Sequence, residues 1–153
     1  MEPKFVDLDT FTVMGILVHA MPDQVDFRAI WEDAFMPHHE VIKALSTDKS
    51  CYGVWFPHHA DGIPDHIAGM RVPEDSPAPE GVTARQVPAS RYAVFECTMS
   101  DIGKTYGYVY NTWLPASPYE FPPGGADFEY YPPEDVTDQP CAVYIPVREK
   151  AAK

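Results

Sequence analysis

The sequence predicts an α+β domain in which a β-α-β-β unit occurs twice and forms one antiparallel or mixed, curved sheet. Two segments have the apolar spacing of amphipathic helices, and each lies between extended apolar runs. These elements follow the same order in both halves of the 153 residues. We therefore expect a single domain over 1–153, with two helices on one face of the sheet and a ligand groove between the copies.

The first copy is expected over about 8–73. Its elements are a strand at about 10–19, a helix at about 23–37, and strands near 51–57 and 66–73. Asp23 can cap the start of the helix, and Pro37 is expected to end it. Its apolar residues recur at the helical spacing i, i+3, i+4, i+7 and i+8, which places Phe27, Ile30, Trp31, Ala34 and Phe35 on one side.

An acidic, proline-rich linker at 74–81 precedes the second copy, which spans about 82–149. Its elements are strands at about 82–87, 91–98, 127–132 and 141–148, and a helix between Ser100 or Asp101 and Pro115. The two helix exits, AFMPHHE and TWLPASP, resemble each other. Aligning the copies pairs Phe35 with Trp113 and Phe56 with Tyr131.

Composition excludes several classes of function. The net charge is −12 with no stripe of Lys or Arg, which argues against direct nucleic-acid binding. Apolar runs stay well short of the ~20 residues of a membrane span, and the start of the chain lacks a signal-peptide pattern. We expect a cytoplasmic protein that does not associate with membranes.

Metal and cofactor motifs are missing from the sequence. The three cysteines, Cys51, Cys97 and Cys141, have no zinc-site spacing and suit a reducing compartment. His38 and His39, like His58, His59 and Asp61, have metal-ligating side chains, but adjacent residues rarely direct two rings at one ion. We interpret them as surface or turn residues. Glycine-rich phosphate and dinucleotide loops are also lacking, so neither metal nor cofactor is expected.

One carboxylate stands among aromatic residues in the segment FEYYPP. Side chains alternate along a strand, so Glu129 and Tyr131 share one face, and Phe128 and Tyr130 share the other. We expect Phe128 and Tyr130 to pack beneath the helices, which would turn Glu129 and Tyr131 into the groove. Aromatic rings with an acid suit a lipophilic cation. The reverse orientation would put Glu129 in the core, which is unusual for a carboxylate. A further alternative is that Glu129 is a strand residue facing solvent.

Four segments resemble those of the GyrI-like, or AraC-effector-binding, small-molecule-binding domains. They read YAVFE, TWLPASPYE, FEYYPP and CAVYIPV. The resemblance implies a bacterial, multidrug-binding effector domain, here as a stand-alone member, with Glu129 as the acid of its pocket. It also implies that Trp113 and Tyr119 line the pocket wall, although helix-to-sheet core packing would equally explain Trp113.

Other strand residues could complete the pocket, but the sequence alone does not fix which way they point. They are Phe56, Met70 and Tyr144. Three functions follow from the resemblance and the residues. The first is binding or sequestration of a lipophilic, cationic aromatic small molecule. The second is hydrolysis of an electrophilic small molecule, with Glu129 as general base and Tyr131 or Tyr119 polarising the leaving atom. The third is interaction with a protein partner such as DNA gyrase.

Overall fold

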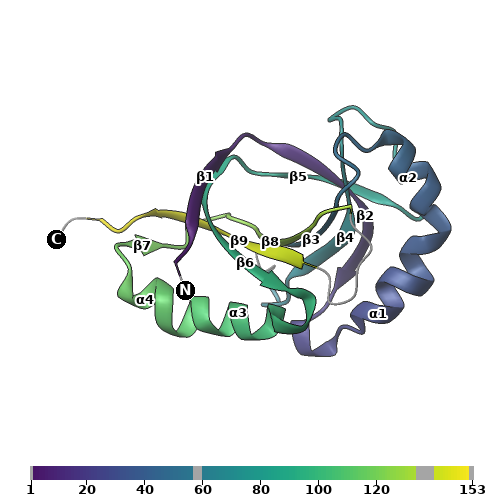
Figure 1. The fold of residues 1–153 in the computed structure, drawn as a ribbon. Helices are drawn as coiled ribbons and strands as arrows, with labels where there is room; N and C mark the ends of the chain where they lie inside the picture. The colour runs from purple at the N-terminus through teal and green to yellow at the C-terminus, as the bar shows by residue number, and fades with distance from the viewer. Residues whose placement is uncertain (1, 57–59, 134–139, 152–153) are drawn as a thin grey trace.

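The computed structural model describes residues 2–56, 60–133 and 140–151. They form one curved sheet in the order β1-β6-β9-β8-β3-β4-β2-β5, and β7 pairs with the end of β9 (Figure 1). Every strand pair of these residues is antiparallel. The strands are β1 (Lys4–Leu8), β2 (Phe11–His19), β3 (Cys51–Phe56), β4 (Asp65–Val72), β5 (Thr83–Val87), β6 (Ser90–Thr98), β7 (Tyr119–Glu120), β8 (Asp127–Tyr131) and β9 (Pro140–Glu149).

The α+β architecture with one curved sheet and two helical segments is the predicted fold. The two halves of the chain meet where β3 pairs with β8. Each half adds its own strands outward from this seam, except that β1 pairs with β6 and β5 pairs with β2. Strands β1 and β7 are not predicted from the sequence. Among the described residues, no helix has both the length and the apolar character needed to span a membrane.

The first helical segment begins and ends later than predicted. After a 3-10 turn η1 (Pro22–Gln24), it runs through α1 (Phe27–Ala29), the π-helical η2 (Ile30–Phe35), the 3-10 turn η3 (Met36–His38) and α2 (His39–Leu45). Its cap is Asp26 rather than Asp23, because the Asp26 carboxylate accepts a hydrogen bond from the Ala29 N–H. Pro37 does not end the segment, since it stands at the start of η3, where a missing N–H is tolerated.

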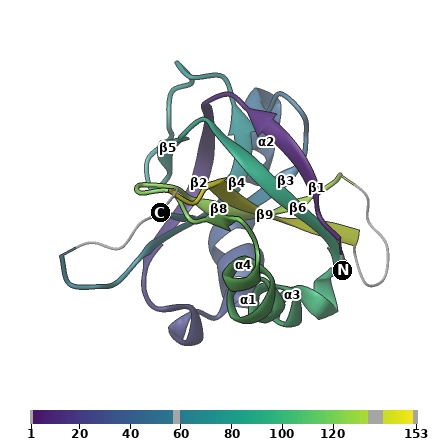
Figure 2. The same ribbon diagram turned by 90° about the vertical axis from the view of Figure 1, so that its left-hand side faces the viewer.

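The second helical segment is built in the same way. It consists of the 3-10 turn η4 (Met99–Asp101), α3 (Ile102–Tyr108), the π-helical η5 (Val109–Trp113) and α4 (Leu114–Ala116). Both segments lie along the outside of the curved sheet, of which β1 and β5 are the edge strands (Figures 1 and 2). Each of the two helical segments contains a π-helical turn, a feature that is frequent near functional sites.

Two apolar clusters join the helical segments to the sheet. Met14 and Met70 pack with Phe35 and Ile42 of the first segment. Phe95 and Val143 pack with Val109 of the second. Between these two clusters, neither helical segment packs directly on the sheet face, and a groove can form there.

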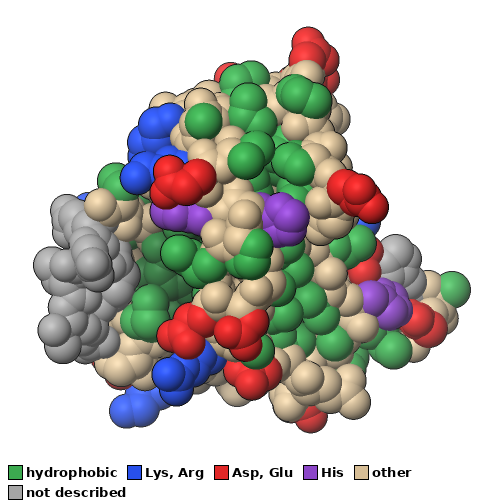
Figure 3. All heavy atoms as spheres, turned by 90° about the vertical axis from the view of Figure 1, so that its right-hand side faces the viewer, with side chains coloured by type: hydrophobic (Ala, Val, Ile, Leu, Met, Phe, Trp, Pro, Cys, Tyr) green, Lys and Arg blue, Asp and Glu red, His purple; other side chains and the backbone are tan. Residues whose placement is uncertain are grey.

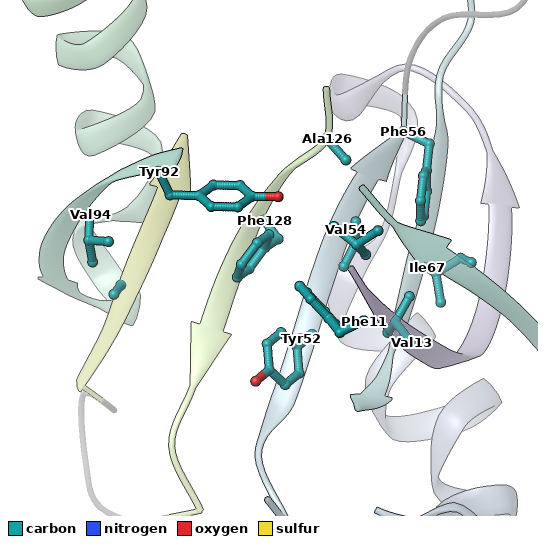
Figure 4. Close-up of a cluster of buried hydrophobic side chains, with 12 residues drawn as sticks. Phe11, Val13, Tyr52, Val54, Phe56, Ile67, Tyr92, Val94, Ala126 and Phe128 are labelled. Atoms are coloured by element: carbon teal, nitrogen blue, oxygen red, sulfur yellow. The ribbon is translucent and has the colours of Figure 1, made fainter. Parts of the chain in front are cut away.

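The opposite sheet face is closed by the sheet's own curvature. Its cluster holds Phe11, Tyr52, Tyr92 and Phe128, drawn from strands far apart in sequence (Figure 4). The Phe128 ring lies 4.6 to 5.7 Å from the ring centres of its aromatic neighbours. The expectation that Phe128 and Tyr130 pack beneath the helices is therefore wrong, because Tyr130 also packs against this cluster. The alternation was read correctly, but the helices and the groove share one face.

Candidate functional site

A cavity of about 1730 Å³ lies between the two helical segments, with strands β3, β4 and β8 as its floor. Its lining is mostly apolar and aromatic, as is usual for small-molecule sites. Viewed from the side of α1 and α2, the surface shows apolar side chains gathered in a band beside a recess, with charged side chains around them (Figure 3). The lining side chains used below are Phe27, Trp31, Trp55, His66, Met70, Tyr106, Tyr110, Asp127, Glu129 and Tyr131.

Strand register determines which side chains form the floor. Glu129 of β8 lies opposite Gly53 of β3. One step along the strands, Asp127 lies opposite Trp55, which in turn pairs with His66 of β4. Because side chains alternate, all of these residues point to the face that carries the helices. The floor thus combines two acids, an indole and an imidazole.

Glu129 is buried, with 6% of its surface exposed. The Tyr106 hydroxyl donates a hydrogen bond of 2.9 Å to its Oε2 atom. Burial raises the pKa of Glu129 to about 8; the Tyr106 hydrogen bond opposes this rise, and the charge of Asp127 adds to it. Glu129 therefore holds its proton near neutral pH unless a positive charge enters the cavity.

Asp127 is a second acid of the site, which the sequence reading did not identify. It accepts a hydrogen bond from the Tyr110 hydroxyl, and burial raises its pKa to about 6. The spacing of the two tyrosines along the helical segment matches that of the two acids along the strand. Four residues of helix rise ~6 Å, and two residues of strand span ~6.6 Å. Tyr106 and Tyr110 stack with an interplanar angle of 2°, so their hydroxyls meet the two acids in parallel.

Aromatic side chains of the first helical segment form the facing wall. Trp31 meets Tyr131 edge to face, with ring centres 6.2 Å apart. Phe27 meets Trp55 and His66 in the same way, at 6.0 and 5.2 Å. A flat or lipophilic ligand can thus contact rings from both sides of the cavity.

The predicted site residues divide into two groups. Glu129, Tyr131 and Met70 line the cavity. Phe56 is also a lining residue, but its ring packs in the cluster on the opposite face, with the Arg85 guanidinium above it. Phe56 and Tyr131 consequently lie on opposite faces of the sheet, so the alignment that pairs them does not match the orientations of their side chains.

The other three predicted residues are not among the described residues that line the cavity. Trp113 and Tyr119 stack on each other 6.2 Å apart, and both contact Phe5 of β1. Tyr144 stacks on Phe128, on the far face of the sheet. All three belong to the packing of the fold, and the placement of Trp113 and Tyr119 at the pocket wall is corrected accordingly.

Potential metal ligands are dispersed. In residues 2–56, 60–133 and 140–151, no group of three or more His, Cys, Asp or Glu side chains could hold a metal ion. His58 and His59 lie outside the described residues. Asp61 instead contacts His19, at 2.8 Å. Cys51 lines the cavity, but burial raises its thiol pKa to about 11, which makes it a poor nucleophile.

Comparison with known proteins gives consistent results. The model of the Cass2 family, described as integron-associated effector binding protein, matches residues 4–147. The transcriptional regulator BrlR of Pseudomonas aeruginosa is 30% identical over 154 residues, which cover 96% of this chain and 56% of BrlR. The chain therefore spans about half the length of that relative.

Solved structures share the fold. SAV2435 bound to tetraphenylphosphonium superposes with a TM-score of 0.79 at 16% identity, covering 97% of this chain and 94% of that one. An integron cassette protein from Vibrio cholerae superposes with a TM-score of 0.65 at 21% identity, covering 97% of both chains. These similarities agree with the α+β fold predicted from the sequence.

Proposed function

Since the chain belongs to the integron-associated effector binding protein family, we propose that it binds a lipophilic, cationic aromatic small molecule between its two helical segments. Membership agrees with the resemblance to effector-binding domains seen in the sequence. The observation that carries the proposal is the pair of acids, Asp127 and Glu129, on the floor of a mostly apolar, aromatic cavity.

A cation gains from this arrangement in two ways. Aromatic faces such as those of Trp31 and Trp55 attract it by roughly 0.5–2 kcal/mol each. The two buried carboxyl groups have raised pKa values, so a positive charge beside them favours their ionised forms and is itself neutralised in a partly dry site. The net charge of −12 also draws cations toward the protein. That SAV2435 was solved with tetraphenylphosphonium supports the same ligand class here.

Calorimetric titration with tetraphenylphosphonium tests the proposal, and triphenylphosphine oxide serves as a neutral aromatic comparison. We expect saturable binding of the cation that is weakened about tenfold or more by Glu129→Gln. A charge about 5 Å away, at an effective dielectric constant of about 20, contributes on the order of 3 kcal/mol before desolvation. Glu96→Gln is the matched control, since this strand acid is exposed and paired only with Lys4 in the described contacts. Equal affinity for the cation and the neutral compound, unchanged in Glu129→Gln, would refute a counter-charge role.

A hydrolase is the second candidate function, favoured by the Glu129 pKa near neutrality and the phenol 2.9 Å away. The ionised fraction of such a carboxyl group can activate water as a general base, and Tyr131 could polarise the leaving atom. Tyr119 has no place in this scheme, because it packs against Trp113 outside the cavity. Incubation with aromatic esters, with product detected by chromatography, separates the two functions: turnover lost in Glu129→Gln supports an enzyme, and binding without product supports a receptor.

A further inference from the structure

Among the described residues that line the cavity, His66 is the buried side chain whose polar atoms have no hydrogen-bond partner in the protein. It is 1% exposed, and neither Nδ1 nor Nε2 has a hydrogen-bond partner among the described residues. Its ring is held between Trp55 and Phe27, with ring centres 4.5 and 5.2 Å away. Leaving a buried polar group unpaired costs about 1–3 kcal/mol, so a fold rarely retains one without a use.

Gly53 leaves open the space that His66 borders. A Cβ atom built on Gly53 would lie 3.1 Å from His66 Nε2 and 3.4 Å from Glu129 Oε2. The φ of Gly53 is not positive, so backbone conformation does not require glycine here. Both polar atoms therefore border one gap in the floor, and a side chain at position 53 would crowd it.

Burial also determines the chemistry of this imidazole. It lowers the pKa of His66 to about 4, so the ring is neutral at pH 7 and one of its nitrogens carries a lone pair. With the proton on Nδ1, Nε2 is an acceptor directed at the gap. The gap then offers two hydrogen-bond acceptors, an imidazole nitrogen and a carboxylate oxygen, to a single donor group.

From this geometry we propose that the cavity selects aromatic cations that carry an N–H group, which donates to His66 Nε2 and Glu129 above Gly53, in preference to cations of fixed charge. The proposal rests on the proposed function and specifies its ligand class. A quaternary or phosphonium cation neutralises the Glu129 carboxylate but leaves His66 Nε2 without a donor. A protonated ring nitrogen supplies both the positive charge and the N–H donor.

Two dyes of the same shape test the preference. Acridine orange is protonated at its ring nitrogen at pH 7 and has no other N–H, whereas 10-methylacridine orange carries a methyl group there and a permanent charge. Fluorescence titration should show roughly tenfold tighter binding of acridine orange, the size of one buried hydrogen bond that is made or left unmade. Equal affinities for the two dyes would overturn the proposal.

Variants separate hydrogen bonding from steric exclusion of the methyl group. His66→Phe keeps a ring between Trp55 and Phe27, so we expect the affinities of the two dyes to converge within about twofold. The convergence should come from weaker binding of acridine orange. The control is His38→Phe, at a residue outside the cavity lining, which should leave the preference for acridine orange intact. A preference that persists in His66→Phe is steric and overturns the proposal.

Gly53→Ala provides a second variant, because its methyl group would occupy the gap, and it should lower acridine orange affinity. Thermal unfolding establishes that each variant is folded. Failure of the inference differs from failure of the proposed function. If tetraphenylphosphonium binds through Glu129 but the acridines bind alike, only the N–H preference is lost. If none of the three cations binds, the proposed function itself is wrong.

Discussion

Substituting Glu129 by Gln should make the protein relatively more stable as the pH rises. Glu129 is 6% exposed, and burial raises its pKa from 4.5 to about 8. Between these values the unfolded chain has released the proton and the folded protein keeps it. Because the folded state binds more protons, the free energy of unfolding of the wild type falls with rising pH in this window. Gln is a neutral amide of the same shape and removes this dependence.

The size of the effect follows from proton linkage. One proton of difference changes the free energy of unfolding by about 1.4 kcal/mol per pH unit. Between pH 5 and pH 7 the variant should therefore gain up to about 3 kcal/mol relative to the wild type. With an m-value of about 2 kcal/mol/M, the urea midpoints should diverge by more than 1 M over this range.

Urea unfolding followed by tryptophan fluorescence at pH 5, 6, 7 and 8 measures this divergence. Glu96→Gln is the control and should keep a constant offset, because both partners of its ion pair with Lys4 have 73% of the side chain exposed. A constant offset for Glu129→Gln as well would show that Glu129 ionises normally in the folded protein. That result would refute the dry, proton-holding site described above.

Three further predictions concern the same features. Tetraphenylphosphonium affinity should rise with pH between about 6 and 8, by up to about tenfold per pH unit for each proton released, because the cation favours ionised Asp127 and Glu129; calorimetry in two buffers of different ionisation enthalpy should detect proton release, and pH-independent binding would contradict it. Tyr106→Phe removes a hydrogen bond that lowers the Glu129 pKa, so the rise in affinity should move to higher pH, which an affinity–pH profile of the variant will show or exclude. Phe128→Ala should cost about 3–5 kcal/mol in urea unfolding, against little for exposed Met36→Ala; similar losses for both would mean that the far-face cluster is not the core.

Local sequence patterns predicted most of the fold because each pattern depends on neighbouring residues. Helical periodicity located both helical segments, and alternation placed Glu129 and Tyr131 on one face. Alternation cannot say which face is buried beneath helices. That is decided by the curvature of the sheet, which brings Phe11 and Tyr92 onto Phe128 across large separations in sequence.

Trp113 illustrates a second limit. The family resemblance placed Trp113 at the pocket wall, while helix-to-sheet core packing remained the alternative. The π-helical turn at Val109–Trp113 departs from 3.6 residues per turn, so ideal helical spacing could not decide between the two. Trp113 packs on Phe95, at 5.2 Å between ring centres, instead of facing the cavity.

Asp127 and His66 were missed for a different reason. Each stands near the start of a strand beside turn-forming residues, where polar side chains are ordinary. Their importance lies in partners from elsewhere, Tyr110 for Asp127 and the gap at Gly53 for His66. Only one local signal was available: Tyr106 and Tyr110 four residues apart on a helix, and Asp127 and Glu129 two apart on a strand.

The two tyrosine–acid hydrogen bonds also link the second helical segment to the sheet. Tyr106 belongs to α3, whereas Glu129 belongs to a strand in the middle of the sheet. A ligand that binds the Glu129 carboxylate competes with the Tyr106 hydroxyl for it. Ligand binding should therefore weaken the hydrogen bond that attaches α3 to the sheet. When the ligand binds, we expect faster amide hydrogen exchange in α3 and η5 and unchanged exchange in the central strands. Slower exchange in α3 and η5 would mean that the ligand strengthens the attachment of this segment to the sheet.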